Sequence, residues 1–333
     1  MWSSQYPYSR LRRNRKAQWS RDITAESTLS VKDFIYPLFI HDKEEDLDIS
    51  TMPGVKRLSL RSLVEVAKQS RDAGIPAIML FPAVDSSLKS LGAEEAYNPD
   101  SCICKAIQMV KAAVPEIGVM ADVALDPYTT HGHDGITDDE GYVSNDATVE
   151  VLVKQALTLA KAGCDVVAPS DMMDGRTGQI RKALEAEGFV NTQILTYAAK
   201  YVSNLYAPFR DAVGSKNNLK KADKKTYQMN FANSKEALMA VSQAVNEGAD
   251  MVIVKPGTPY LDIIKTVSDH CPLPVIPYQV SGEYAVMKLA AANGILAAFE
   301  PVMFELLLGM KRAGASAILT YAALEMAHYL AEV

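Results

Sequence analysis

The sequence predicts an α/β protein that folds as a (β/α)8 TIM barrel and carries an extended N-terminal arm. From residue 34 onward, short apolar runs alternate with longer segments of helical periodicity. The apolar runs are continuous rather than alternating, which is typical of parallel strands buried on both faces. At 333 residues, the chain is long enough for one barrel of about 250 residues with additions. One closed parallel barrel accounts for all three observations.

Eight apolar runs are the expected strands: Phe34 to Ile40, Ala77 to Phe81, Ile117 to Val123, Asp165 to Ala168, Gln193 to Ala198, Met251 to Val254, Val275 to Val280 and Ala317 to Tyr321. The expected helices lie between and after them: Leu60 to Ala73, Ser101 to Ala113, Ala147 to Ala162, Gly178 to Ala186, Ser234 to Glu247, Tyr260 to His270, Tyr284 to Ala292 and Val302 to Ala313. Several of these segments end at a glycine, as helix C-termini commonly do. An open doubly wound sheet is the alternative, but no run is followed by the G-x-G-x-x-G turn of a dinucleotide site.

Composition limits the classes of partner. With 34 basic and 40 acidic side chains, the chain has a formal charge of −6, which argues against generic nucleic-acid binding. No apolar stretch approaches the roughly 18 residues that span a bilayer. Four cysteines at irregular positions are too few for a disulfide scaffold, so a reducing compartment is the default. We therefore expect a cytoplasmic protein that binds neither nucleic acid nor membrane.

The N-terminal segment departs from this acidic average. Five basic residues cluster there among aromatic side chains, and no acidic residue precedes Asp22: Arg10, Arg12, Arg13, Arg15 and Lys16, with Tyr6, Tyr8 and Trp19 around them. A transit peptide, a nucleic-acid arm and an extension that docks on a neighbouring subunit are the three interpretations, beside a merely solvated tail. We expect residues 1–30 to form an arm for subunit contacts and residues 31–333 to form the catalytic barrel.

Two lysines follow neighbouring strands of the expected barrel. The fifth run is followed by Lys200 and the sixth by Lys255, so both amines fall at the C-terminal edge, where barrel enzymes keep their chemistry. A single lysine just past a strand is usually solvated. Two together, with apolar walls, lower each other's pKa from about 10.4 toward the 7–8 that an amine nucleophile needs. Such amines attack carbonyl groups to form Schiff bases.

Acidic residues cluster after the third expected strand. Asp122 and Asp126 lie at the strand exit, and Asp134 follows in a glycine-containing loop. Three oxygen ligands suit a hard cation such as Mg2+ and suit zinc less well, because no thiolate is present. A polar turn in which aspartate caps a helix is the alternative interpretation.

Further polar groups surround the same edge. The lysine-rich segment from Gly214 to Lys225 is interpreted as a mobile lid, and its charge, together with Arg210, would attract a carboxylate or phosphate. Taken singly, Lys216, Lys220 and Lys221 are expected to be solvated. Hydroxyl side chains at other strand ends, including Ser170, Ser281 and Tyr321, bind a carboxylate or cap the next helix.

Taken together, these motifs resemble the porphobilinogen synthase (δ-aminolevulinic acid dehydratase) family over nearly the whole chain. The matching segments include Asp122 to Gly135, Thr196 to Tyr201, Tyr206 to Asp211, Val254 to Pro256 and Tyr278 to Tyr284. The resemblance implies condensation of two 5-aminolevulinate molecules to porphobilinogen, with loss of two waters, in tetrapyrrole (heme) synthesis. Another Schiff-base lyase acting on a different keto acid and a catalytically silent barrel are the alternatives.

The resemblance also implies roles for single residues. Lys255 would bind the first substrate molecule, whose carboxylate meets Ser281 and Tyr321. Lys200 would bind the second, whose carboxylate meets Arg210, Lys224 and Gln228. Phe81, Ser170 and Tyr206 would complete the substrate pocket, with Phe209 as a further wall.

Departures from the family pattern bear on metals and assembly. Where zinc-dependent members carry three cysteines, this chain has Ala124, Asp126 and Asp134, so the resemblance implies the aspartate-rich subgroup associated with Mg2+ and no active-site zinc. Ala240 stands where many bacterial members have a glutamate that anchors a stimulatory Mg2+, which argues against an allosteric magnesium. The resemblance further implies a homo-octamer in which the arm embraces a neighbouring barrel.

Overall fold

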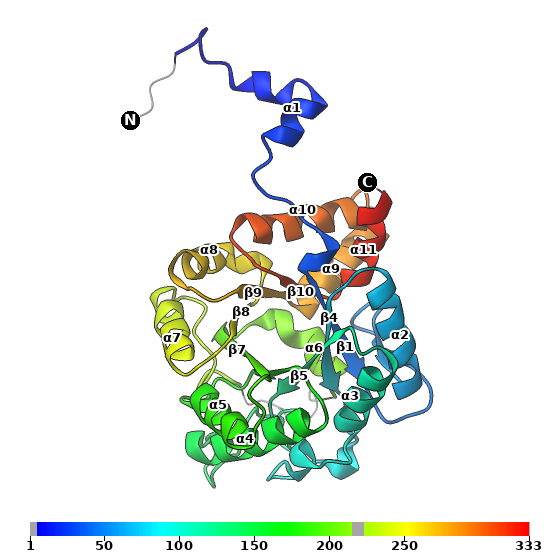
Figure 1. The fold of residues 1–333 in the computed structure, drawn as a ribbon, viewed down its shortest axis with the longest axis vertical. Coiled ribbons are helices and arrows are strands. Elements are labelled where there is room, and N and C mark those ends of the chain that lie inside the picture. The colour runs from blue at the N-terminus through cyan, green and yellow to red at the C-terminus, as the bar shows by residue number, and fades with distance from the viewer. Residues whose placement is uncertain (1–4, 215–222, 333) are drawn as a thin grey trace.

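The computed structural model describes residues 5–214 and 223–332. Parallel strands form a closed barrel (Figure 1), in chain order: β1 (Phe34–Ile40), β4 (Ala77–Pro82), β5 (Gly118–Val123), β6 (Val166–Pro169), β7 (Gln193–Lys200), β8 (Met251–Lys255), β9 (Val275–Gln279) and β10 (Ile318–Thr320). Pairing of Phe34 with Ile318 and of Ile35 with Leu319 closes β1 onto β10. The predicted (β/α)8 barrel is confirmed, and each predicted strand lies within two residues of an observed one.

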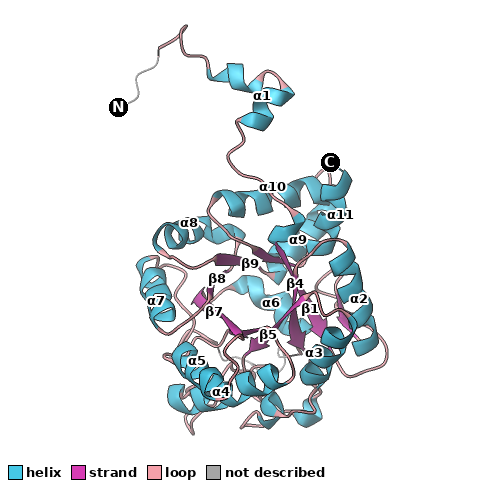
Figure 2. Cartoon of the chain, viewed as in Figure 1, coloured by secondary structure: helices cyan, strands magenta, loops and turns pink. Residues whose placement is uncertain are grey.

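Helices cover the outside of the barrel (Figure 2): α2 (Leu60–Asp72), α3 (Cys102–Ala113), α4 (Asn145–Lys161), α5 (Arg176–Ala186), α7 (Lys235–Asn246), α8 (Leu261–His270), α9 (Ser281–Ala292), α10 (Phe299–Arg312) and α11 (Ala323–Glu332). Each turns an apolar face to the sheet, as Leu63 and Ala67 of α2 do. The first eight of these match predicted helices to within three residues at either end. No helix among the described residues is long and apolar enough to cross a membrane.

Several elements were not predicted. The C-terminal helix α11 buries Ala323, Met326 and Ala327, and the short helix α6 (Ala207–Ala212) follows β7. A small antiparallel pair, β2 (Leu47–Asp48) and β3 (Lys56–Leu58), extends the sheet beside β1. Because β2 and β3 carry mostly exposed or half-buried residues, neither forms the apolar run that marks a strand in the sequence.

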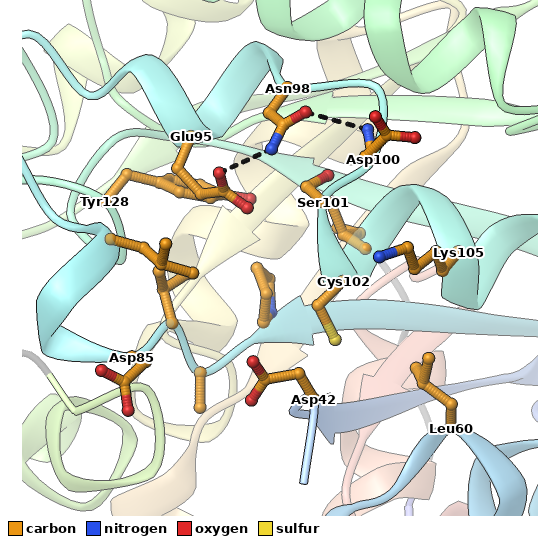
Figure 3. Close-up of a pocket in the computed structure, with 15 residues that line it drawn as sticks. Asp42, Leu60, Asp85, Glu95, Asn98, Asp100, Ser101, Cys102, Lys105 and Tyr128 are labelled. Atoms are coloured by element: carbon orange, nitrogen blue, oxygen red, sulfur yellow. Dashed lines mark hydrogen bonds between the residues drawn. The ribbon is translucent and has the colours of Figure 1, made fainter.

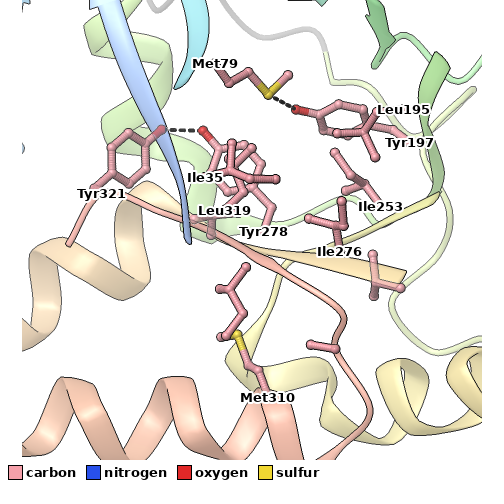
Figure 4. Packing of buried hydrophobic residues seen from close by; sticks show 14 of the residues in the cluster. Ile35, Met79, Leu195, Tyr197, Ile253, Ile276, Tyr278, Met310, Leu319 and Tyr321 are labelled. Atoms are coloured by element: carbon pink, nitrogen blue, oxygen red, sulfur yellow. Dashed lines mark hydrogen bonds between the residues drawn. The ribbon is translucent and has the colours of Figure 1, made fainter. Parts of the chain in front are cut away.

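The barrel interior is filled by large side chains. Ile35, Met79, Leu195, Ile253 and Leu319, from five different strands, pack together in one buried cluster (Figure 4). Tyr197, Tyr278 and Tyr321 lie in the same cluster, where their hydroxyls are available for hydrogen bonds. The interior is therefore a packed core rather than a pore, and charged groups are confined to one end of it.

The N-terminal segment extends away from the barrel, beyond α10 (Figure 1). It contains a single turn of 3-10 helix (Leu11–Arg15) and the short helix α1 (Gln18–Ile23). Its aromatic side chains are not buried on their own barrel, since Tyr6 is 77% exposed, Tyr8 86% and Trp19 68%. The arm for subunit contacts, with its boundary at residue 30, stays a prediction. Most of the predicted lid, residues 215–222, lies outside the described residues.

Candidate active site

The two predicted lysines end adjacent strands. Lys200 is the last residue of β7 and Lys255 the last of β8, and the two are paired in register. The register shifts by one residue between Thr196 and Ala199, where β7 contains an irregularity of the bulge type. Side chains that face each other across parallel strands point to the same side of the sheet, so both amines enter the barrel mouth.

A cavity at this mouth brings together most of the predicted site residues: Phe81, Asp122, Asp126, Asp134, Ser170, Lys200, Tyr206, Arg210, Lys224, Gln228 and Lys255, with Phe209. Its volume is about 20 Å³, and charged side chains pair with one another inside it. The residues come from β4, β5, β7 and β8 and from the loops after β5, β6 and β7. The fold therefore brings these distant segments together at one end of the barrel.

The amine of Lys255 lies in a cage of aromatic rings. Its Nζ is within cation–π distance of four ring centroids: Tyr278 at 4.4 Å, Phe209 at 4.9 Å, Tyr206 at 5.0 Å and Tyr197 at 5.3 Å. Burial lowers the pKa of Lys255, and the nearby charge of Lys200 lowers it further, to about 7. The amine is therefore available as a neutral nucleophile near neutral pH.

Lys200 has more polar surroundings. Its Nζ donates a hydrogen bond to the carbonyl oxygen of Ser170 and lies 3.7 Å from Oδ1 of Asp134. The same amine lies 5.8 Å from the ring centroid of Tyr197, so one tyrosine lies beneath both lysines. The two amines thus share a wall but differ in their partners, one aromatic and one anionic.

Three buried carboxylates face the lysines. Lys224 lies 3.1 Å from Oδ2 of Asp126 and 2.9 Å from Oδ2 of Asp134, bridging the two. Burial opposes the ionisation of Asp134, but Lys200 and Lys224 outweigh it and lower its pKa to about 2. Burial raises the pKa of Asp122 to about 7, with Lys200 opposing, and also raises the pKa of Asp126. Burial likewise opposes the charge of Lys224, yet the two aspartates raise its pKa.

The loop that carries Asp134 is held by close packing. At Gly135 a Cβ atom would lie 2.5 Å from Oγ1 of Thr148 and 2.6 Å from Cγ1 of Val143, so the loop approaches α4 as only glycine allows. On the other side, the hydroxyl of Tyr227 accepts a hydrogen bond from the backbone N–H of Asp134 at 3.3 Å. These contacts explain why a loop residue far from β7 reaches the lysines.

The predicted magnesium ligands do not form a metal site in this arrangement. Among residues 5–214 and 223–332, no group of three or more histidine, cysteine or acidic side chains is placed to hold a metal ion. Asp122, Asp126 and Asp134 line one cavity, but the ammonium of Lys224 lies between the last two, where a cation would need to bind. The residues as arranged fit an internal ion-pair network better than Mg2+.

Two predicted residues lie just behind the cavity wall. The Oγ of Ser281 accepts a hydrogen bond from the backbone N–H of Phe209 at 2.9 Å, and the hydroxyl of Tyr321 is 2.7 Å from that of Tyr278. Both Phe209 and Tyr278 contact Lys255, so Ser281 and Tyr321 lie on the Lys255 side of the cavity. Gln228 lies on the Lys224 side, with its Oε1 buried and without a partner among the described residues.

Sequence reasoning missed several residues that shape the site. Tyr197 and Tyr278 face the lysines, and both lie inside predicted strands. Since side chains of a barrel strand alternate between inside and outside, this alternation could have indicated that both tyrosines point inward. Asp171 and Arg176 form a buried ion pair of 3.2 Å beneath Tyr197, whose carbonyl oxygen accepts a hydrogen bond from Arg176 at 2.8 Å. That pair supports the end of β7 from the side of α5.

A (β/α)8 barrel with a caged, weakly basic lysine beside a second lysine defines an enzyme that acts on carbonyl compounds through amine nucleophiles. The comparisons with known proteins agree with this class. The profile of the family described as delta-aminolevulinic acid dehydratase matches residues 8–329. The chain belongs to this family.

Similar proteins span nearly the whole chain. A delta-aminolevulinic acid dehydratase of Bradyrhizobium diazoefficiens is 51% identical over 322 residues, 96% of this chain and 90% of that protein. A chloroplastic one of Glycine max is 49% identical over 324 residues, 97% of this chain and 78% of that protein. The crystal structure of the Toxoplasma gondii enzyme, in complex with its reaction product porphobilinogen, matches with a TM-score of 0.95 at 48% identity, covering 97% of this chain and 92% of that one.

Proposed function

We propose that this chain condenses two molecules of 5-aminolevulinate to porphobilinogen, with loss of two waters, through imines on Lys255 and Lys200. The observation that carries the proposal is the amine of Lys255, buried among aromatic rings with its pKa lowered to about 7 and with Lys200 beside it. The structure of the Toxoplasma gondii relative holds the reaction product porphobilinogen, and this product supports the substrate class of the proposal. The reaction belongs to tetrapyrrole synthesis.

The environments of the two lysines suggest an order of events. The neutral amine of Lys255 attacks the keto carbon of the first molecule, and loss of water leaves an imine. Lys200 is held by Ser170 and Asp134, so its amine must first leave those partners before it attacks the second molecule. Each imine acidifies the neighbouring carbons, so a C–C bond and a C–N bond form between two tethered molecules and both lysines are released.

The polar residues divide into two groups that suit two substrate carboxylates. Ser281 and Tyr321 lie on the Lys255 side, and Arg210, Lys224 and Gln228 lie around the other end of the cavity. Phe81, Tyr206 and Phe209 supply apolar walls, since Phe81 and Phe209 meet edge to face at 5.3 Å. We assign the first group to the first substrate molecule and the second group to the second.

Trapping with borohydride tests the function. The full-length protein is incubated with 5-aminolevulinate, and the pyrrole product is measured by its colour reaction. Borohydride then reduces any imine, and peptide mass spectrometry locates the adduct. We expect product and an adduct on Lys255 that Lys255→Met removes, while Lys265→Met, an exposed lysine of α8, retains both. Absence of product would refute the proposal. An adduct with a different keto acid and none with 5-aminolevulinate would point to another lyase.

The metal requirement stays a prediction from the sequence. The resemblance implies Mg2+ at Asp122, Asp126 and Asp134, whereas the ion pairs of Lys224 satisfy two of these carboxylates. No step proposed above depends on a metal. Ala240 of α7 carries no oxygen ligand, which supports the absence of a stimulatory Mg2+ at that helix.

Assembly and compartment complete the proposal. The exposed aromatic and basic residues of the arm suit docking on another copy of the chain, and we propose a homo-octamer. Light scattering of the full chain and of a variant lacking residues 1–30 tests this, because loss of the arm should reduce the oligomer size. All four cysteines are free thiols, which fits a reducing compartment such as the cytoplasm. Fractionation of cells tests the cytoplasmic assignment.

A further inference from the structure

A second cavity lies outside the barrel mouth, between the loops after β1 and β4 and the first turn of α3 (Figure 3). Its volume is about 410 Å³, enough for a small organic molecule. It is lined by Asp42 after β1, by Asp85 after β4 and by Ser101 and Cys102 at the start of α3. None of the residues assigned above to the reaction lines it.

The lining of this cavity is strongly acidic. Four carboxylates and one basic side chain surround it: Asp42, Asp85, Glu95 and Asp100, with Lys105. Within the described ranges, none of the four carboxylates forms an ion pair. Glu95 accepts a hydrogen bond from Asn98 at 2.8 Å, which orients its carboxylate at the cavity wall (Figure 3). Like charges gathered around one hollow favour a cationic occupant.

A buried hydroxyl in the same cavity lacks a partner. Tyr128 is 1% exposed, and its hydroxyl has no hydrogen-bond partner among the described residues. Leaving a buried hydroxyl unpaired costs free energy, so such groups generally have a partner in the functional state. In Figure 3 the ring of Tyr128 lies beside the carboxylate of Glu95 at the cavity wall. This hydroxyl is an acceptor for an N–H donor, independently of the acidic rim.

The remaining walls are apolar, formed by Leu60, Pro82, Val84, Leu88 and Ile103. They suit a short alkyl chain. A metal ion does not fit, because the described residues contain no group of side chains placed to hold one. An anion does not fit four unpaired carboxylates. The chemistry left is an organic cation with N–H donors at its charged ends and methylene groups between them.

We propose that this cavity binds a short aliphatic diamine in its ammonium form. One ammonium group is held by the carboxylate of Glu95 and donates to the hydroxyl of Tyr128, the other is held by the carboxylate of Asp42 across the cavity, and the alkyl chain between them lies on Val84 and Ile103. The binding site is separate from the two lysines and does not depend on the proposed reaction.

Calorimetry with the full-length protein tests the proposal. The probe is 1,4-diaminobutane, and the controls are 1,4-butanediol, which has no charge, and succinate, which has the opposite charge, all at one ionic strength. We expect saturable binding of the diamine alone. Asp42→Asn and Glu95→Gln should each weaken it about tenfold, as loss of a charged hydrogen bond does. Glu116→Gln, an exposed carboxylate preceding β5 at the opposite end of the barrel, should leave it unchanged.

Cys102 supplies a second measurement that needs no variant. Its side chain lines the cavity, whereas Cys271 follows α8 elsewhere on the barrel and is an internal control. The diamine should slow alkylation of Cys102 by N-ethylmaleimide and leave that of Cys271 unchanged, as followed by peptide mass spectrometry. Unchanged alkylation of Cys102 at saturating diamine, equal diamine affinity in the Asp42→Asn and Glu95→Gln variants, or binding of succinate in place of the diamine would each overturn the proposal.

Discussion

The lowered pKa of Lys255 makes a quantitative prediction about the pH dependence of imine formation. The pKa falls from 10.5 to about 7, chiefly through burial and then through Lys200. Because the protonated amine cannot attack a carbonyl, the reactive form is present above the pKa and is lost as the pH falls through about 7. The rate of adduct formation on Lys255 should therefore rise with pH and level off above pH 8.

The size of the effect follows from the neutral fraction of the amine. At pH 7, a lysine with an ordinary pKa is neutral in about one molecule in 3,000, whereas Lys255 is neutral in about half. Between pH 8 and pH 6 the neutral fraction of Lys255 falls about tenfold, compared with about a hundredfold for an ordinary lysine. The slope of the profile thus distinguishes the caged amine from a solvated one.

A single-turnover experiment measures this slope. Enzyme in excess is mixed with 5-aminolevulinate at each pH, the imine is reduced with cyanoborohydride after set times, and the modified peptide is quantified by mass spectrometry. Free Nα-acetyl-lysine under the same conditions is the solvated control. A rate on Lys255 that keeps rising about tenfold per pH unit up to pH 9 would refute the reasoning.

Replacing Lys200 separates the two causes of the lowered pKa. Both amines lie near the same ring of Tyr197, at 5.8 and 5.3 Å from its centroid, so they are at most about 11 Å apart. At that distance and an effective dielectric constant of about 20, one charge contributes about 1.5 kcal/mol, or about one pKa unit. Lys200→Met should move the midpoint of the Lys255 profile up by at least that amount. An unmoved midpoint would assign the whole effect to burial.

Three further predictions follow from the ion pairs. Arg176→Met leaves Asp171 buried without its partner at 3.2 Å, so the free energy of unfolding should fall by about 3–5 kcal/mol in guanidinium titrations, and a change below about 1 kcal/mol would contradict this. Lys224→Met should raise the KM for 5-aminolevulinate about tenfold or more, whereas Lys225→Met, whose side chain is 67% exposed, should not; equal effects would remove Lys224 from the substrate site. Dialysis against EDTA should leave most of the activity if Lys224 serves as the internal counterion, and a loss that Mg2+ reverses would support the sequence-based magnesium expectation instead.

The barrel and the two lysines could be predicted from the sequence because both produce local sequence patterns. Each strand is a short apolar run, and a lysine at the end of such a run lies at the catalytic edge once the fold class is known. The positions of Lys200 and Lys255 therefore followed from the order of elements alone. The three aspartates and the strand-end hydroxyls of Ser170, Ser281 and Tyr321 were predicted from their positions as well. The roles of Lys224, Gln228, Phe81 and Tyr206 came from the family resemblance alone.

The ion pairs of the site could not be predicted from the sequence. Lys224 contacts Asp134, a residue far away in the chain, on a loop whose path is set by close packing at Gly135. From the sequence alone, three aspartates and no cysteine indicate a metal site, and nothing local shows that a lysine lies between two of them. Tyr197 was missed for a related reason, since an aromatic residue inside a strand looks the same whether it faces a helix or an amine.

The irregularity in β7 has a consequence for how one strand presents two side chains to the same chamber. Leu195 aligns with Met251, but Ala199 aligns with Val254, so β7 contains one residue more than β8 over this stretch. Tyr197 and Lys200 are three positions apart, and regular alternation would turn their side chains to opposite faces of the sheet. The extra residue offsets this, so the ring of Tyr197 and the amine of Lys200 face the same chamber. The wall that the two amines share is therefore built by an irregularity in strand pairing.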